Sequence, residues 1–135
     1  IPPQKTNQIF TPRWVVKKMV DMLEEDSSCF SDPTKTFADL YMKSGLYITE
    51  IVKRLYQNET MIELYPDSEE RLKHIFKHQV YGLAPTEIIY KISTNYILGF
   101  DATAHKIEHN FKQIDALEYA KEGTLEELVD SIWNK

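Results

Sequence analysis

The sequence predicts an α/β domain with a small parallel sheet. Three short apolar segments, at residues 36–41, 79–83 and 110–114, have the length and composition of buried strands. Longer segments with apolar residues at helical spacing separate them, and strands that alternate with helices usually form a parallel sheet. The length of 135 residues suits one domain. We therefore expect a single domain over residues 1–135, in which residues 1–10 form a polar arm.

Composition narrows the classes of function. The net charge is −5 at pH 7 and the basic residues form no stripe, which argues against a chain that binds nucleic acid by itself. No apolar run reaches the roughly 20 residues of a membrane span, and the first residues do not have the pattern of a secretion signal. The single cysteine, Cys29, fits a reducing compartment. We expect a cytoplasmic protein without membrane contact.

The first half of the chain carries clear helix and strand signals. Thr11-Pro12 predicts a helix start, because threonine caps free amides and proline fits the first helical position. We expect residues 25–35 to form a loop and residues 58–66 to be irregular. Between them, the strand at residues 36–41 leads through Ser44-Gly45 into an amphipathic helix, which is typical of the start of a βαβ unit.

The second half repeats this alternation. Asp67, with Glu70 three residues later, predicts a helix start, and Pro85 predicts the start of the helix after the second strand. That helix is expected to have a broad apolar face, made of Ile88, Ile89, Ile92, Tyr96 and Ile97. Thr124 and Glu127 predict a last helix by the same capping pattern. Its core face would consist of Leu125, Leu128, Val129 and Ile132.

The turn after the first strand carries the strongest functional signal. It reads Asp39-Leu40-Tyr41-Met42-Lys43-Ser44-Gly45. Ligands of open parallel sheets bind beyond the carboxyl ends of the strands. A glycine there lets backbone approach a ligand closely, and an acid at the strand end suits a ligand with a positive amine. Tyr41 and Met42 would lie beside such a ligand. The pattern alone also fits an ordinary tight turn.

Further motifs stand at matching places along the chain. Phe10-Thr11-Pro12 precedes the first helix, Tyr81-Gly82 belongs to the second strand, and Asp115-Ala116-Leu117 follows the third. Together with residues 39–45, they resemble the N-terminal half of an S-adenosylmethionine-dependent DNA adenine-N6 methyltransferase of restriction–modification systems. The resemblance covers nearly the whole chain. It implies a partial Rossmann-like class I methyltransferase fold, with three parallel strands in the order 3-2-1, flanking helices and a preceding N-terminal helix.

The resemblance implies S-adenosylmethionine as cofactor and assigns roles to particular residues. Thr11 and Pro12 would lie near the methionine part of the cofactor, Asp39 and Gly45 at its amine and carboxylate. Asp115 would meet the adenine. No catalytic or metal-binding residue is implied in this segment. The implied cofactor-binding residues are Phe10, Thr11, Pro12, Asp39, Tyr41, Met42, Ser44, Gly45, Asp115, Ala116 and Leu117.

Two positions depart from the family pattern. Lys43 stands where the family usually has the first glycine of its Asp-Pro-x-x-Gly-x-Gly turn. The lysine would either obstruct the methionine tail or turn out to solvent. Ala84 stands where the family has the acid that holds the ribose hydroxyls, and Glu87, one turn away, is the candidate for a substitute.

The family's catalytic motif, Asn or Asp followed by Pro-Pro and an aromatic residue, has no counterpart here. The Pro2-Pro3 pair lies in the N-terminal arm and precedes Gln4. The sequence also lacks an initiator methionine and ends about where a fourth strand would begin. We therefore expect a fragment that is inactive alone, and that meets DNA through its parent protein.

Two other functions stay open. The first is a non-catalytic Rossmann-like interaction module of a restriction complex with a degenerate cofactor site, which Lys43 and Ala84 favour. The second is a small α/β nucleotide-binding protein unrelated to methyl transfer.

The histidine pairs His74/His78 and His105/His109 have the i,i+4 spacing of metal ligands. Without a third ligand in the pattern, we interpret them as solvated polar positions.

The implied strand order leaves an edge unpaired. In that order a fourth strand would pair along the free side of the strand at residues 36–41. An unpaired apolar edge is a site of self-association, so we expect the chain to dimerise or aggregate through it.

Overall fold

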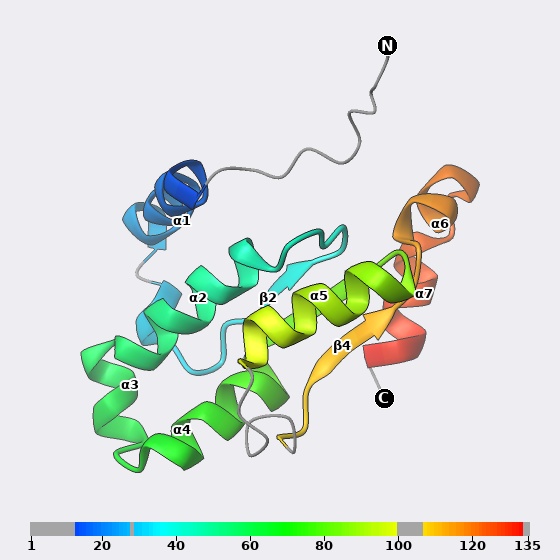
Figure 1. Ribbon diagram of the computed structural model, residues 1–135. Helices are drawn as coiled ribbons and strands as arrows, with labels where there is room; N and C mark the ends of the chain where they lie inside the picture. Colours follow the sequence, from blue (N-terminus) through cyan, green and yellow to red (C-terminus); the bar gives the residue numbers. More distant parts are fainter. Residues whose placement is uncertain (1–12, 28, 100–106, 134–135) are drawn as a thin grey trace.

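The computed structural model describes residues 13–27, 29–99 and 107–133. It is an α/β structure around a parallel sheet of β2 (Phe37–Asp39), β3 (Val80–Ala84) and β4 (Asn110–Gln113), in the order β2-β3-β4 (Figure 1). The predicted α/β class, parallel pairing and strand order are thereby confirmed. The predicted polar arm lies outside the described residues.

The register brings the ends of the strands to one edge of the sheet. Asp39 lies opposite Gly82, and Ala84 lies opposite Gln113. Because the strands are parallel, the loops that follow them leave on the same side, which is where ligands of open α/β sheets bind.

Helices surround the sheet (Figure 1). The longer ones are α1 (Arg13–Ser27), α2 (Leu46–Gln57) and α5 (Glu87–Leu98). The shorter elements are η1 (Cys29–Ser31), α3 (Glu59–Leu64), α4 (Ser68–His74), the π-helical turn η2 (Ile75–Gln79), α6 (Ala116–Glu122) and α7 (Leu125–Trp133).

The main core lies between the sheet and the helices α2 and α5, which lie side by side in Figure 1. Its side chains include Ile48, Ile51 and Leu55 of α2, Ile97 of α5 and Val80 of β3. These helical residues share one face at the i, i+3, i+4 spacing, which is why an amphipathic sequence folds onto the sheet.

The other face of the sheet is covered more lightly. Tyr81 points away from Val80 and Gly82, because side chains alternate along a strand. Its ring contacts Trp133 of α7, with 5.1 Å between the ring centroids. The predicted core face of α7, Leu125, Leu128, Val129 and Ile132, is half-buried, and no residue of this helix is fully buried. The predicted side of the helix is therefore correct, but it packs less closely than a core face.

The predicted loop at residues 25–35 is also wrong in part. Helix α1 continues to Ser27, and η1 follows it. Cys29 and Phe30 of η1 are buried, and Phe30 stacks on Phe37 of β2 with ring centroids 5.3 Å apart. Burial of two apolar side chains gives this polar segment its regular structure.

Residues 58–66, predicted as irregular, contain helix α3. The Asn58 side chain accepts hydrogen bonds from the amides of Thr60 and Met61, which caps the helix start. Met61 is fully buried. The predicted helix start at Asp67 is confirmed, since its carboxylate accepts from the amide of Glu69 at 2.9 Å.

The predicted apolar face of α5 is largely exposed. Ile88 is 70% exposed and Ile92 is 51% exposed. Ser93 and Thr94 are buried in their place, because each hydroxyl donates to a backbone carbonyl one turn earlier. The helix also begins at Glu87, with Thr86 rather than Pro85 at its start.

The C-terminal region departs most from prediction. Helix α6 was not expected, and β4 ends at Gln113, one residue short of the predicted strand. The Thr124 hydroxyl donates to the carbonyl of Tyr119 instead of capping α7.

Candidate functional site

The turn between β2 and α2 is fixed by packing against α5. Gly45 precedes α2 with φ of 87°, a backbone conformation that suits glycine. A Cβ at this position would lie 3.0 Å from the carbonyl oxygen of Ser93 and 3.0 Å from Cγ1 of Ile97. A glycine is therefore required here both by conformation and by space. The Ser44 hydroxyl accepts from the amide of Leu46 at 3.3 Å.

Met42 anchors the same turn to the sheet. Its amide donates to the carbonyl of Leu83 at 2.9 Å, and its side chain is fully buried. The methionine sulfur occupies the space where a side chain on Gly82 would lie. Because Gly82 has no side chain, the Met42 side chain can pack against this strand, and this packing holds the turn against the sheet.

Asp39 is a half-buried carboxylate at the end of β2. It accepts a hydrogen bond from the amide of Tyr41 at 3.0 Å. Burial raises the pKa of Asp39 above its ordinary value, and the hydrogen bond from Tyr41 opposes this in part. Burial, together with the negative charge of Asp39, also raises the pKa of Tyr47. Asp39 is therefore a partly desolvated acid that would gain from a positive partner.

The second functional loop follows β4. The carboxylate of Asp115 accepts from the amide of Leu117 at 3.2 Å and so caps α6. The amide of Ile114 donates to the carbonyl of Ala84 at 2.8 Å, which holds the loop beside β3. Ala116 is buried, whereas Leu117 is 50% exposed.

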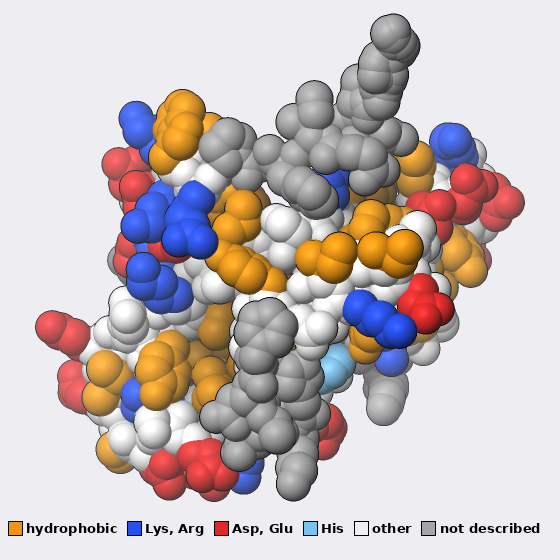
Figure 2. All heavy atoms as spheres, in the orientation of Figure 1, with side chains coloured by type: hydrophobic (Ala, Val, Ile, Leu, Met, Phe, Trp, Pro, Cys, Tyr) orange, Lys and Arg blue, Asp and Glu red, His pale blue; other side chains and the backbone are white. Residues whose placement is uncertain are grey.

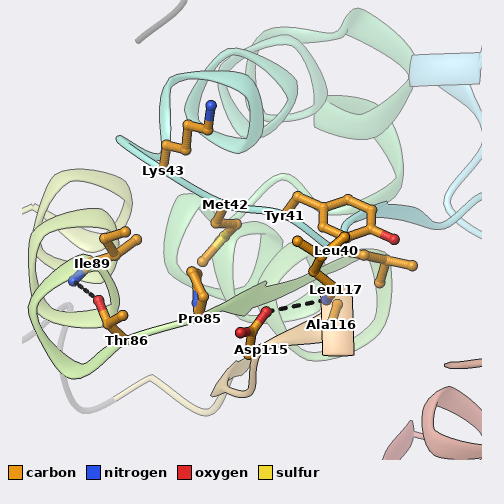
Figure 3. A pocket seen from close by; sticks show the side chains of 10 residues that line it. All are labelled: Leu40, Tyr41, Met42, Lys43, Pro85, Thr86, Ile89, Asp115, Ala116 and Leu117. Carbon is orange, nitrogen blue, oxygen red and sulfur yellow. Dashed lines mark hydrogen bonds between the residues drawn. The ribbon is translucent and has the colours of Figure 1, made fainter. Parts of the chain in front are cut away.

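A cavity of about 320 Å³ lies between these loops, at the carboxyl ends of the three strands (Figure 3). Tyr41 and Met42 line it from the first loop, and Asp115, Ala116 and Leu117 line it from the second. This volume is within the range of small-molecule sites. The structure thus brings together two predicted motifs that are about 70 residues apart in the sequence.

A second cavity of about 300 Å³ adjoins the β2–α2 turn. It contains the other predicted residues of that turn, Asp39, Ser44 and Gly45. Tyr41 and Lys43 line both cavities. The two cavities are therefore neighbours. Phe10, Thr11 and Pro12, the remaining predicted site residues, lie outside the described residues.

The two departures from the family pattern differ in position. The Lys43 side chain points away from the other residues around the first cavity (Figure 3). Ala84 is buried at the end of β3. Glu87 forms an ion pair with Lys91 at 3.2 Å and lines neither cavity, so its suggested role as a substitute acid is not supported.

Sequence reasoning missed several residues of the first cavity. Leu40, Pro85, Thr86 and Ile89 also line it. The Thr86 hydroxyl accepts from the amide of Ile89 at 3.2 Å and caps α5. Pro85 and Thr86 could have been predicted, because the loop after the middle strand of an open parallel sheet also faces the ligand.

The histidines provide no metal site within the described ranges, where no three His, Cys, Asp or Glu side chains gather to hold an ion. The prediction of a solvated position is wrong for His74, which is half-buried, donates from Nε2 to the carbonyl of Pro33 at 2.9 Å and stacks on Tyr65. His105 lies outside those ranges. No helix in the described part of the chain has the length and apolarity to cross a bilayer.

Comparison with known proteins identifies no relative: no family model matches the chain, and no curated protein matches its sequence.

Proposed function

We propose that this chain is the cofactor-binding part of an S-adenosylmethionine-dependent DNA adenine-N6 methyltransferase with a partial Rossmann-like fold. One observation carries the proposal. The motifs at residues 39–45 and 115–117, which suggested this family, line two adjoining cavities at the carboxyl ends of parallel strands.

The charges around the cavities fit the cofactor. S-adenosylmethionine has a positive amine and sulfonium, a carboxylate and an adenine amino group. Asp39 offers a partly desolvated carboxylate to the amine, and Asp115 offers an acceptor to the adenine amino group. Gly45 allows the turn that carries Asp39 to pack closely against Ser93 and Ile97 of α5, which fixes the position of that turn. The residues present therefore fit the proposed cofactor.

In this proposal, the chain binds and orients the cofactor, which when bound supplies a methyl group activated by the sulfonium. Tyr41 and Leu117, each 50% exposed, provide apolar walls that limit water around the ligand. The sequence contains no Asn/Asp-Pro-Pro-aromatic motif, so residues beyond it would hold the target base and complete the reaction. DNA would bind through those other parts of the protein.

Calorimetric titration tests the proposal. We expect saturable binding of S-adenosylmethionine and S-adenosylhomocysteine, and much weaker binding of ATP. Asp39→Ala should weaken S-adenosylmethionine by roughly tenfold or more, because a charge-assisted contact is lost. Asp67→Ala, which removes an acid that lines neither cavity, is the matched control. A folded chain that prefers ATP, or that binds none of these ligands, would overturn the proposal.

A non-catalytic interaction module is the second candidate, favoured by the exposed side of α5. Ile88, Ile92 and Tyr96 are exposed there, and Figure 2 shows apolar side chains gathered over this helix. A folded chain with no affinity for adenosyl ligands, in which Ile88→Lys with Ile92→Lys abolishes capture by other restriction subunits, would support this function instead.

A further inference from the structure

Lys43 is the residue whose position the proposed function does not yet explain. It lines both cavities, and it is the cation among the described residues that line them, where Asp39 and Asp115 are the acids. Its side chain is exposed, and no ion pair joins it to another described residue. An ammonium group that has no ion pair and lies at the junction of two cavities is free to bind a negatively charged group of a ligand.

The neighbouring acid defines which ligand group fits. Asp39 and Lys43 line the same cavity of about 300 Å³, beside the β2–α2 turn. An acid and a base in one small cavity match the two charges of an amino-acid zwitterion. A phosphate fits less well, because the partly desolvated carboxylate of Asp39 would repel it.

We propose that Lys43 is a specificity-determining residue that pairs with the carboxylate of the cofactor's methionine tail. This inference rests on the proposed function. It assigns Lys43 a contact with the cofactor, where the sequence suggested that the lysine would either obstruct the methionine tail or turn out to solvent. Figure 3 supports it, because the side chain leaves the first cavity free for the adenosine part. Asp39 would then hold the amine, and Lys43 the carboxylate, of the same tail.

The contact is expected to have a moderate effect on affinity. Lys43 is exposed, so water screens its pairing with the carboxylate. We expect roughly a fivefold to tenfold contribution to affinity, which lies between the values for an exposed ion pair and for a hydrogen bond to a charged group. The effect should appear only with ligands that carry the carboxylate.

The test compares two ligands that differ in that one group. Calorimetric titrations use S-adenosylmethionine and decarboxylated S-adenosylmethionine, with 5′-deoxy-5′-methylthioadenosine as the ligand without the whole amino-acid tail. The variant is Lys43→Met, which keeps length and removes charge. Lys53→Met is the matched control, because Lys53 is an exposed lysine of α2 that lines neither cavity. Circular dichroism confirms that each variant is folded.

We expect Lys43→Met to weaken S-adenosylmethionine by roughly fivefold to tenfold and the other two ligands by less than about twofold. Equal effects on all three ligands, or none, would overturn the inference while leaving the proposed function intact. Tighter binding of S-adenosylmethionine by Lys43→Gly would also overturn it, because it would show obstruction. Failure of the unmodified, folded chain to bind any adenosyl ligand would overturn both proposals.

Discussion

The two loops of the candidate site are held by different kinds of contact. The β2–α2 turn packs into the main core: Met42 is fully buried, and Gly45 lies against α5. The loop after β4 leads into α6 and α7, where Ala116 is the buried residue and α7 has none. The β2–α2 turn is therefore anchored in the core, and the loop after β4 is more loosely supported.

This difference has a physical meaning for binding. A loop with few buried contacts opens locally at low cost, whereas a loop in the core opens only when the domain unfolds. A ligand that contacts both loops would order the second one, and part of its binding energy would be used for that ordering. Substitutions that act on the two loops should therefore differ in their effects on stability.

The largest effect is expected at the two glycines with similar backbone conformations. Gly45 has φ of 87° and Gly123 has φ of 76°, but only a Cβ at Gly45 meets neighbouring atoms within 4 Å. Gly45→Ala should lower the free energy of unfolding by about 3 kcal/mol, from strain plus crowding. Gly123→Ala, at the end of α6, should cost at most about 1 kcal/mol, because there is strain alone and local opening of α6 can relieve it.

Urea denaturation measures both variants, and Gly123→Ala is the control for backbone strain. Equal losses would contradict the comparison, because they would show that packing around the β2–α2 turn adds nothing to its stability.

A smaller effect is expected for the two aspartate caps. Asp115 caps α6 and Asp67 caps α4, each by accepting a backbone amide. Replacement of either by alanine should cost about 1 kcal/mol. For Asp67→Ala the loss should appear in global unfolding, because α4 leads into the buried Ile75 and Phe76. For Asp115→Ala it should appear as faster amide exchange confined to α6.

Hydrogen exchange followed by NMR separates these outcomes, with urea denaturation as the global measure. If Asp115→Ala lowered global stability as much as Asp67→Ala, then α6 would belong to the same cooperative unit as the core, and the contrast between the loops would fail.

Asp39 should give a pH-dependent effect. Because burial raises the pKa of Asp39 in the folded state, the folded chain binds this proton more tightly than the unfolded chain. Its contribution to stability therefore falls as the pH rises from the ordinary value of 3.8 through the raised pKa. Asp39→Asn should be more stable than the unmodified chain at neutral pH, and the difference should shrink on acidification towards pH 3.8.

Chemical denaturation across this pH range measures the effect. A second readout is Tyr47, whose pKa should fall in Asp39→Asn because the charge of Asp39 contributes to raising it. The phenolate absorbance, assigned with Tyr47→Phe, reports that shift. A constant stability difference at all pH values would contradict the prediction.

The same contrast explains how far the sequence could predict the molecule. The turn from Asp39 to Gly45 was predicted because its signals are local: an acid at a strand end, then a glycine before an amphipathic helix. Asp67 was predicted for the same reason, since a cap is read from neighbouring residues.

The errors concern contacts between distant segments. An apolar period predicts a face on α5, but it does not say whether that face is covered, and Ile88 and Ile92 prove to be exposed. Burial of Ser93 depends on a hydroxyl that bonds back to the carbonyl of Ile89. Thr86 joins the cavity only because β3 lies between β2 and β4.

The smallest effect is expected at the edges of the sheet. In the described residues β2 and β4 are the outer strands, and β2 has an exposed alanine, Ala38, whereas β4 carries an exposed lysine, Lys112. Charged side chains protect sheet edges from pairing with other chains. Because β2 is only three residues long, we expect weak, concentration-dependent self-association. Ala38→Lys should reduce it, and Gln113→Lys on β4 should not. Light scattering that shows a monomer at every concentration over about a tenfold range would contradict the role of this edge.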